Sequence, residues 1–239
     1  MRTALVTGGT TGIGAAISTA IKATGARVAA THSGNEARAA AFSTATGIPT
    51  FRWDVSDHAA CATGIADVEA ALGPIDILVN NAGITCDASL LKMNPEAWKR
   101  VLAVDLDSCF NMAQVVVGGM KARRWGRIVN IASINGQTGQ FGQTNYAAAK
   151  AGMLGFTKAL ALEVARDGVT VNAVAPGYTD TEMVAAVAPE IMKTIVARIP
   201  VGRLAQPNEI ARCVAFLVAE EAGFITGSTL SVNGGQAMI

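Results

Sequence analysis

The sequence predicts an α/β fold in which helices cover both faces of a parallel sheet. Short apolar runs rich in β-branched residues alternate with Ala-rich helical patterns along the chain. The short runs are continuously apolar, as is typical of strands that are buried on both faces. This alternation predicts a Rossmann-type, doubly wound parallel sheet.

The expected elements follow one another in regular order. We expect strands at Thr3–Thr7, Arg27–Thr31, Thr50–Trp53, Ile75–Val79, Arg127–Ala132, Val169–Ala175 and Thr229–Val232. We expect helices at Gly12–Thr24, Asn35–Thr46, Asp57–Leu72, Pro95–Arg123, Thr144–Asp167 and Pro207–Ala219. Because no linker, repeat or low-complexity segment interrupts this order, residues 1–239 are expected to form a single domain.

One segment, residues 177–203, departs from the alternation. Pro189 and Pro200 lie around a short helical pattern at Glu182–Ile199. The segment follows the strand that ends near Ala175, so it lies at the carboxyl edge of the sheet, where ligands of such sheets bind. We therefore expect residues 177–203 to be a substrate lid.

Composition restricts the possible partners. The chain is 51% hydrophobic and 15% charged, which argues against disorder. Its net charge of +1 is spread without a basic or acidic block, so neither nucleic acid nor an anionic membrane is an expected partner. Nothing at the N-terminus resembles a signal peptide, and no apolar stretch is expected to reach the ~20 residues that a membrane helix needs. These observations favour a cytoplasmic protein.

The four cysteines give no sign of a metal site. Cys61, Cys86, Cys109 and Cys213 are widely scattered and lack metal-ligand spacing. We expect free thiols in a reducing compartment, and no metal.

A Gly-rich turn, Thr7–Gly14, follows the first strand and opens the first helix. Glycine permits a tight turn, and backbone N–H groups at a helix N-terminus bind a pyrophosphate well. An ordinary Gly-rich turn is the alternative, but the position between strand and helix favours dinucleotide binding.

The end of the second strand bears on the choice between NAD and NADP. A carboxylate there would bind the ribose 2′-hydroxyl and repel a 2′-phosphate. No acid occurs before Glu36, while Thr31, His32 and Ser33 offer hydrogen bonds to a phosphate. The sequence therefore favours NADP(H), although no arginine stands nearby in the expected place and His32 also fits a plain surface histidine.

Polar residues follow the next two strands. Asp54 and Val55 come after one strand, and Asn80–Gly83 after the next. Both groups are expected at the carboxyl edge, near the adenine, where Asp54 would accept a hydrogen bond from the amino group. Loop capping by Asp and Asn is the alternative.

The candidate catalytic residues are Ser133, Tyr146 and Lys150. Tyr146 and Lys150 are four residues apart on a predicted helix and therefore share a face. A neighbouring ammonium favours a phenolate, which makes a tyrosine usable as an acid or base near neutrality. Ser133 follows the preceding strand, where its hydroxyl can bind the same substrate oxygen.

Taken together, these motifs resemble the short-chain dehydrogenase/reductase family over essentially the whole chain. The matching segments are Thr7–Gly14, Asn80–Gly83, Ser133, Tyr146–Lys150, Pro176–Met183 and Val232–Gly235. The resemblance implies seven strands, a homotetramer and Tyr146 as proton donor, with Lys150 binding the nicotinamide ribose. The cofactor-binding residues expected from motif and resemblance are Gly8, Thr10, Thr11, Gly12, Ile13, Gly14, Thr31, His32, Ser33, Asp54, Val55, Asn81, Ala82, Gly83, Tyr146, Lys150, Pro176, Gly177 and Thr181.

Asp105 is a departure from the family pattern, which has an asparagine that holds a water linking the lysine to solvent. Asp is nearly isosteric with Asn but donates no hydrogen bond unless protonated. We expect its charge to attract Lys150 and activity to survive with an altered pH profile.

The loop between Ser133 and Tyr146 resembles that of acetoacetyl-CoA reductases of polyhydroxybutyrate synthesis. The resemblance implies NADPH-dependent reduction of acetoacetyl-CoA to (R)-3-hydroxybutanoyl-CoA. The expected substrate-binding residues are Asp87, Lys92, Ser133, Gln140, Phe141, Gln143, Tyr146 and Tyr178. Loop packing and loop hydrogen bonding are the alternatives for Phe141 and the glutamines.

Two other functions remain open. One is a 3-oxoacyl-carrier-protein reductase, for which Lys121, Arg123, Arg124 and Arg127 would form a basic docking patch. The other is a non-catalytic NADP-binding sensor, with Asp105 as a sign of decay. The intact catalytic residues argue against the sensor.

Overall fold

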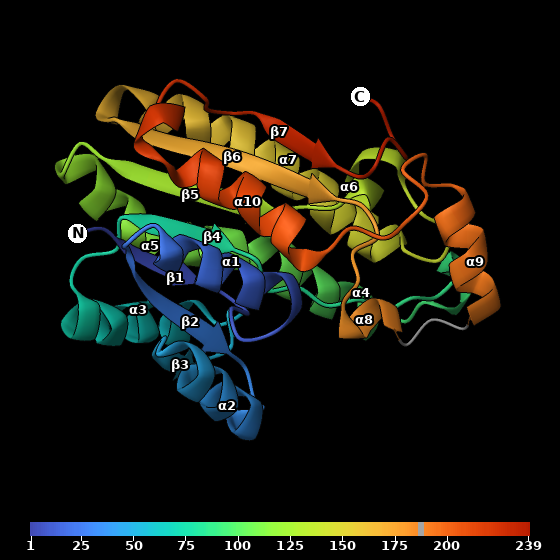
Figure 1. Cartoon of the computed structure of the whole chain (residues 1–239), viewed down its shortest axis with the longest axis horizontal. Helices are drawn as coiled ribbons and strands as arrows, with labels where there is room; N and C mark the ends of the chain where they lie inside the picture. Colours follow the sequence, from blue (N-terminus) through green and yellow to red (C-terminus); the bar gives the residue numbers. More distant parts are fainter. Residues whose placement is uncertain (186–188) are drawn as a thin grey trace.

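A seven-stranded parallel sheet forms the centre of the molecule (Figure 1). The computed structural model describes residues 1–185 and 189–239. The strands are β1 Thr3–Val6, β2 Arg27–His32, β3 Thr50–Arg52, β4 Ile77–Asn80, β5 Gly126–Ile131, β6 Val169–Pro176 and β7 Thr229–Val232. They are arranged in the order β3-β2-β1-β4-β5-β6-β7 and all pair in parallel. The predicted fold class is therefore confirmed.

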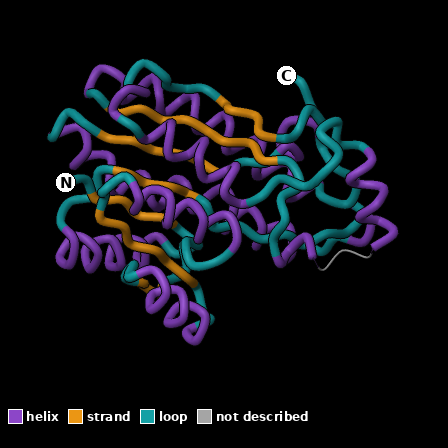
Figure 2. The backbone as a smooth tube through the Cα atoms, in the orientation of Figure 1, coloured by secondary structure: helices purple, strands orange, loops and turns teal. Residues whose placement is uncertain are grey.

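Helices lie on both faces of the sheet (Figure 2). The longer helices are α1 Gly12–Ala23, α2 Glu36–Thr46, α3 His58–Leu72, α4 Pro95–Leu102, α5 Ser108–Ala122, α7 Thr144–Val164 and α10 Pro207–Val218. Successive residues of β1 divide the core: Ala4 and Val6 pack with α1 and α10, whereas Leu5 packs with α3, α5 and α7. Because both faces are covered, apolar residues occur at successive positions of the central strands.

The strand order reverses between β1 and β4. From β1 the chain builds outward through β2 and β3, and from β4 it builds outward through β5, β6 and β7. A ligand crevice in an open α/β sheet lies at such a switch point, outside the carboxyl ends of the strands.

The helix expected at Pro95–Arg123 is not uniform. A π-helical turn, η2, occupies Ala103–Asp107 between α4 and α5, and the backbone N–H of Ser108 donates to the carbonyl of Ala103. By length and composition the run Pro95–Ala122 could cross a membrane, which sequence inspection did not anticipate, but half of its most apolar window is buried. It packs against α3 and the sheet as a core helix does.

The remaining elements lie at the two edges of the sheet. Helices α6 Ile134–Thr138, α8 Glu182–Ala185 and α9 Pro189–Ala197 and the 3₁₀ turn η1 Leu90–Lys92 lie beyond the carboxyl ends of the strands, whereas the 3₁₀ turns η3 Ala165–Asp167 and η4 Glu220–Ala222 lie at the amino ends. In place of the single helical pattern expected at Glu182–Ile199, the structure has α8 and α9, and residues 186–188 lie outside the described residues. Figure 1 shows both helices beyond the end of β6.

Candidate active site

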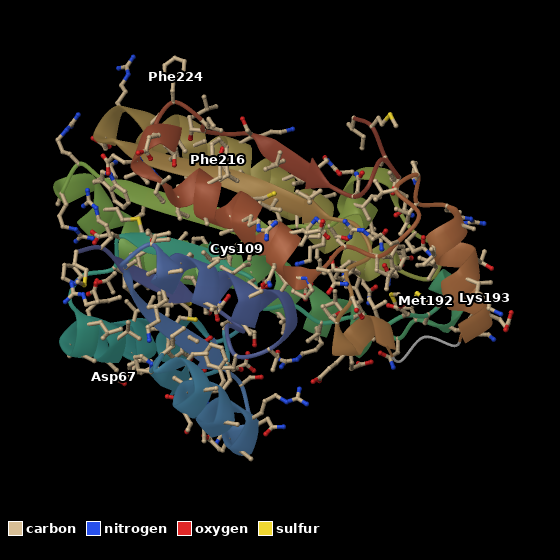
Figure 3. All side chains as sticks on the ribbon, viewed as in Figure 1. Asp67, Cys109, Met192, Lys193, Phe216 and Phe224 are labelled. Atoms are coloured by element: carbon tan, nitrogen blue, oxygen red, sulfur yellow. The ribbon has the colours of Figure 1, made fainter. Side chains whose placement is uncertain are left out.

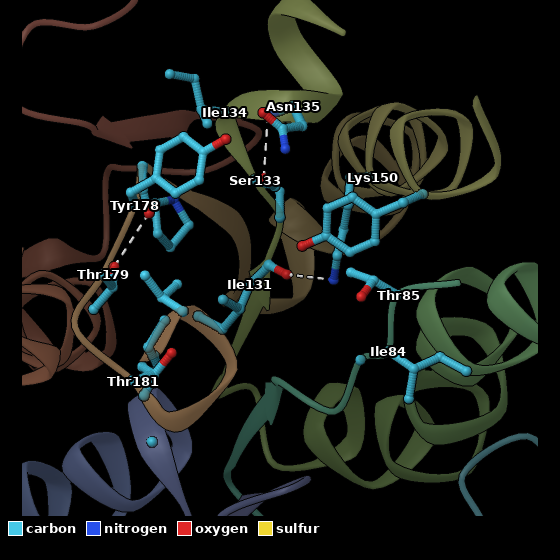
Figure 4. Close-up of a pocket in the computed structure, with 18 of the residues that line it drawn as sticks. Ile84, Thr85, Ile131, Ser133, Ile134, Asn135, Lys150, Tyr178, Thr179 and Thr181 are labelled. Carbon is cyan, nitrogen blue, oxygen red and sulfur yellow. Dashed lines mark hydrogen bonds between the residues drawn. The ribbon is translucent and has the colours of Figure 1, made fainter. Parts of the chain in front are cut away.

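A cavity of about 640 Å³ opens at the carboxyl ends of β1, β4, β5 and β6 (Figure 4). Nineteen residues that the sequence predicts for the site line it: Gly8, Thr11, Gly12, Ile13, Gly14, Asn81, Ala82, Gly83, Asp87, Ser133, Gln140, Phe141, Gln143, Tyr146, Lys150, Pro176, Gly177, Tyr178 and Thr181. Most of the predicted site thus comes together in one place.

Other predicted residues lie outside the lining. They are Thr10, Thr31, His32, Ser33, Asp54, Val55, Lys92 and Asp105. Of the other lining residues, Thr179, Glu182, Val184, Ile191 and Ile195 lie in the expected lid, and Asn135 lies in the loop between Ser133 and Tyr146. The part of the wall that was not predicted consists of Ile84, Thr85, Ile131, Ala132 and Ile134. Because many of these residues are apolar, they carry no chemical signal by which sequence inspection finds a site.

The Gly-rich turn is held in place by the end of β4. The hydroxyl of Thr7 accepts hydrogen bonds from the backbone N–H groups of Asn81 and Ala82, and the Asn81 amide donates to the Thr7 and Gly8 carbonyls. A Cβ at Gly14 would collide with the Gly8 carbonyl and the Asn81 amide, so the turn requires glycine there. This close-packed backbone at the start of α1 fits a pyrophosphate.

At the end of β2, the predicted phosphate ligands already have protein partners. The Thr31 hydroxyl is buried and accepts a hydrogen bond from the Gly8 backbone N–H. Nε2 of His32 lies 3.7 Å from Oε2 of Glu36, whose Oε1 pairs with Arg52 at 3.0 Å. Ser33 is exposed. No carboxylate ends the strand itself, but Glu36 occupies the neighbouring space.

Asp54 and Val55 make hydrogen bonds that stabilise the loop in which they lie. Asp54 accepts hydrogen bonds from the Ser56 backbone and hydroxyl and from Arg100. Although burial opposes it, these contacts lower the pKa of Asp54. The Val55 carbonyl accepts from the Asn111 amide at 3.0 Å. The loop-capping alternative is therefore the one that these contacts support.

Ser133 and Lys150 are positioned by β5 and α7. Ser133 is the N-cap of α6, where its Oγ accepts from the Asn135 backbone N–H at 3.1 Å, which leaves its hydroxyl proton free to donate. Nζ of Lys150 donates to the Ile131 carbonyl at 3.0 Å, as Figure 4 shows, and lies 5.5 Å from the Tyr146 ring centroid. The lysine is buried, whereas Tyr146 is half-buried and borders the cavity.

Asp105 forms a buried ion pair with Lys150. Its Oδ1 accepts from the Ile84 backbone N–H at 2.8 Å, and its Oδ2 lies 3.3 Å from Nζ of Lys150. Burial raises the pKa of Asp105. Burial lowers the pKa of Lys150, but the interactions with Asp105, Tyr146 and Cys109 together outweigh burial and raise that pKa. The π-helical turn that carries Asp105 was not predicted, although such turns are frequent at functional sites.

Hydrogen bonds organise the loop at the cavity mouth. The Gln143 amide donates to Asp87 at 2.8 Å and accepts from the Asn135 amide at 2.8 Å. The buried Asn145, at the start of α7, donates to the Cys86 carbonyl and so ties the segment after β4 to α7. Phe141 is 89% exposed although it borders the cavity.

Tyr178 and Lys92 occupy different surroundings. Burial raises the pKa of Tyr178, and Figure 4 shows this side chain on the same cavity as Ser133. Lys92 ends the exposed turn η1 and does not reach the cavity lining.

Comparisons with known proteins identify the family of the chain. A family model described as enoyl-(acyl carrier protein) reductase matches residues 8–237. The chain belongs to the short-chain dehydrogenase/reductase family, whose oxidoreductases use nicotinamide coenzymes.

Curated relatives match over nearly the full length. The chain is 60% identical to an acetoacetyl-CoA reductase of Rhizobium meliloti, over 98% of each chain. It is 59% identical to an acetoacetyl-CoA reductase of Shinella zoogloeoides, over 100% of this chain and 99% of the relative. A 3-oxoacyl-[acyl-carrier-protein] reductase of Escherichia coli is 45% identical over 99% of this chain and 97% of its own.

Proposed function

We propose that this enzyme reduces acetoacetyl-CoA to (R)-3-hydroxybutanoyl-CoA with NADPH, as a step in polyhydroxybutyrate synthesis. The observation that carries the proposal is the cavity wall between Ser133 and Tyr146, where Gln140, Phe141 and Gln143 line the same space as the catalytic side chains. The full-length similarity to two acetoacetyl-CoA reductases supports this substrate over others of the family.

Ser133, Tyr146 and Lys150 have different roles in the proposed carbonyl reduction. The Gly-rich turn and Gly83 would hold NADPH, which would supply the hydride to the carbonyl carbon. The Ser133 hydroxyl donates a hydrogen bond to the carbonyl oxygen, and the Tyr146 hydroxyl gives that oxygen its proton. Lys150 orients the nicotinamide ribose and provides the nearby positive charge. The stereochemistry follows from the family resemblance.

The coenzyme preference rests on the end of β2. His32 ends the strand and no acid stands in that place, which favours a 2′-phosphate over a bare 2′-hydroxyl. Glu36 is exposed and paired with Arg52, so its charge is offset.

Residues 177–203 are proposed as the lid. Tyr178, Thr181 and Ile195 from this segment line the cavity, and Glu182 forms an ion pair with Arg38 of α2 at 2.7 Å. The segment thus touches both the substrate side and the coenzyme side, as a lid that closes over both ligands must.

The carrier-protein alternative has less support. Its predicted docking cluster lies at the amino end of β5, opposite the edge that holds the cavity. Lys121 and Arg124 pair with Asp167, Arg123 pairs with Asp76, and Arg127 is buried. The non-catalytic sensor is disfavoured because Ser133, Tyr146 and Lys150 lie together in one cavity.

A homotetramer in the cytoplasm completes the proposal. Large apolar side chains are exposed on the elements around β7, which is an edge strand. Phe216 of α10 is 53% exposed and Phe224, before β7, is fully exposed. Figure 3 labels both on the same side of the molecule. Association of copies would cover such side chains.

The test is steady-state NADPH oxidation with acetoacetyl-CoA, beside acetoacetyl-carrier protein and with NADH as a control. We expect strong preference for the CoA ester and for NADPH. Tyr146→Phe should lower kcat by roughly 10²–10⁴-fold while coenzyme binding persists. Preference for the carrier-protein ester would establish the alternative, and tight NADPH binding without turnover would establish the sensor.

A further inference from the structure

Two opposite charges are buried together behind the proposed catalytic tyrosine. Asp105 has no exposed surface and Lys150 is 3% exposed. Oδ2 of Asp105 lies 3.3 Å from Nζ of Lys150 and receives no hydrogen bond from the described residues. A lysine with no counter-charge would present a full positive charge to the neighbouring phenol, whereas the Asp105 carboxylate offsets part of the charge of Lys150.

The other titratable groups around the pair do not alter this balance at neutral pH. Tyr146 faces Lys150 from the same helix, and Cys109 of α5 faces both Lys150 and Asp105. Burial raises the pKa of Cys109 to about 12, so its thiol stays neutral. The negative charge of Asp107, on the same π-helical turn as Asp105, also raises the pKa of Cys109. From the β4 side, the Ile84 backbone N–H contacts Asp105.

Charge counting shows what the carboxylate does. With Asp105 ionised, Lys150 charged and Tyr146 protonated, the buried group is neutral, and loss of one proton leaves a net negative charge. With an uncharged residue at 105, the same proton loss would take the group from +1 to neutral. Since an uncompensated buried charge is costly, the first proton leaves less readily when Asp105 is present.

We propose that Asp105 offsets the charge of Lys150 and thereby holds Tyr146 in its protonated, proton-donating form into alkaline solution. This inference rests on the proposed function, because it takes Tyr146 as the proton donor. Ketone reduction uses the protonated phenol, and alcohol oxidation uses the phenolate. Asp105 is therefore a positioning residue that sets the pH range of the reaction through Lys150.

The chain contains two tyrosines, which makes the phenol directly observable. In a Tyr178→Phe background, Tyr146 is the one remaining phenol, and the ultraviolet absorbance of its phenolate can be followed against pH in the coenzyme-free protein. Asp105→Asn keeps the shape of the side chain and the oxygen that accepts from Ile84. We expect this substitution to move the phenolate midpoint down by about one pH unit or more.

Kinetics give a second readout. For Asp105→Asn alone, the alkaline limb of the pH profile of kcat/KM for acetoacetyl-CoA reduction should move to lower pH, as the phenolate midpoint does. A merely structural role would lower activity at every pH without moving the limb. The double variant Tyr146→Phe/Tyr178→Phe provides the absorbance blank, and circular dichroism defines the pH range in which each variant is folded. If Asp105→Asn does not fold, Asp105→Ser carries the same expectation.

The outcomes separate the two proposals. An unchanged phenolate midpoint in a folded variant would overturn the role of Asp105, because it would mean that the carboxyl carries no charge that Tyr146 experiences. If the unmodified protein does not reduce acetoacetyl-CoA, the proposed function fails, and if Tyr146→Phe retains reductase activity, the proposed role of Tyr146 as proton donor fails, whatever the titration shows. If Tyr146→Phe is inactive and the midpoint is unmoved, the inference about Asp105 alone fails.

Discussion

Gly83 lies against the Asp105 carboxylate so closely that a Cβ at position 83 would be 2.9 Å from Oδ2. The same Cβ would be 3.3 Å from Nζ of Lys150. Position 83 lines the cavity next to both groups, so the absence of a side chain there leaves room for the buried ion pair.

Gly83→Ala is therefore expected to displace the ion pair. Overpacking of this kind costs about 1–3 kcal/mol of unfolding free energy, and a displaced Lys150 should lower kcat by roughly ten- to a hundred-fold. Thermal unfolding and steady-state kinetics measure the two effects.

A double-mutant cycle identifies the cause. In an Asp105→Ala background the added methyl group no longer meets the carboxylate, and its remaining close contact is the flexible end of Lys150, so Gly83→Ala should cost less stability there. Equal costs in both backgrounds would show that the methyl group clashes with something other than Asp105.

The end of β2 gives a prediction about coenzyme choice. His32→Asp places a carboxylate on the last residue of the strand, where it can accept from a ribose 2′-hydroxyl and repel a 2′-phosphate. We expect the KM for NADPH to rise roughly tenfold or more and the KM for NADH to fall. His32→Asn, which has the same shape without the charge, is the control. A similar loss of NADPH affinity in both variants would mean that the imidazole itself is the ligand.

The strands and the clustering of Ser133, Tyr146 and Lys150 in one cavity could be predicted because their signals are local. A continuous apolar run bounded by glycine or polar residues identifies β1 wherever it lies, and the spacing of Tyr146 and Lys150 fixes their shared face of a helix. β7 was predicted to the residue at Thr229–Val232. Such features require no knowledge of the rest of the fold.

The features that were not predicted depend on distant contacts. The π-helical turn at Ala103–Asp107 leaves no mark in the hydrophobic pattern, and α6 is too short to have a period. Thr31 was a candidate phosphate ligand, but its hydroxyl is engaged by Gly8, a contact between separate segments that packing alone decides.

The apolar face around β7 gives a prediction about assembly. Phe216→Asp would place a charge at the proposed subunit contact, so we expect light scattering to report a smaller assembly than for the unmodified protein. Ala66→Asp, on the exposed side of α3, adds the same charge elsewhere and should leave the mass unchanged. A monomeric unmodified protein at working concentration would contradict the homotetramer itself.

An ion pair between Arg203 and Glu209, at the N-terminal end of α10, gives a prediction about stability in acid. Arg203 binds both carboxylate oxygens of Glu209, at 2.7 and 2.8 Å, and the Gln206 backbone N–H also donates to Glu209. The hydrogen bonds from Arg203 lower the pKa of Glu209 most, the one from Gln206 adds to this effect, and the pKa falls to about 2. Since this pKa is lower in the folded protein, the contribution to stability is full above the ordinary value of 4.5 and is lost as the pH falls toward about 2.

Glu209→Gln keeps the capping hydrogen bond to Gln206 but removes the charge. We expect its Tm to lie below that of the unmodified protein at pH 7, and the gap to narrow as the pH is lowered to the most acidic value at which both remain folded. Glu190→Gln, which disrupts the single-oxygen pair with Lys193 on α9, should produce a smaller gap. A gap for Glu209→Gln that stays constant with pH would show that the capping geometry, and not the carboxylate charge, stabilises the start of α10.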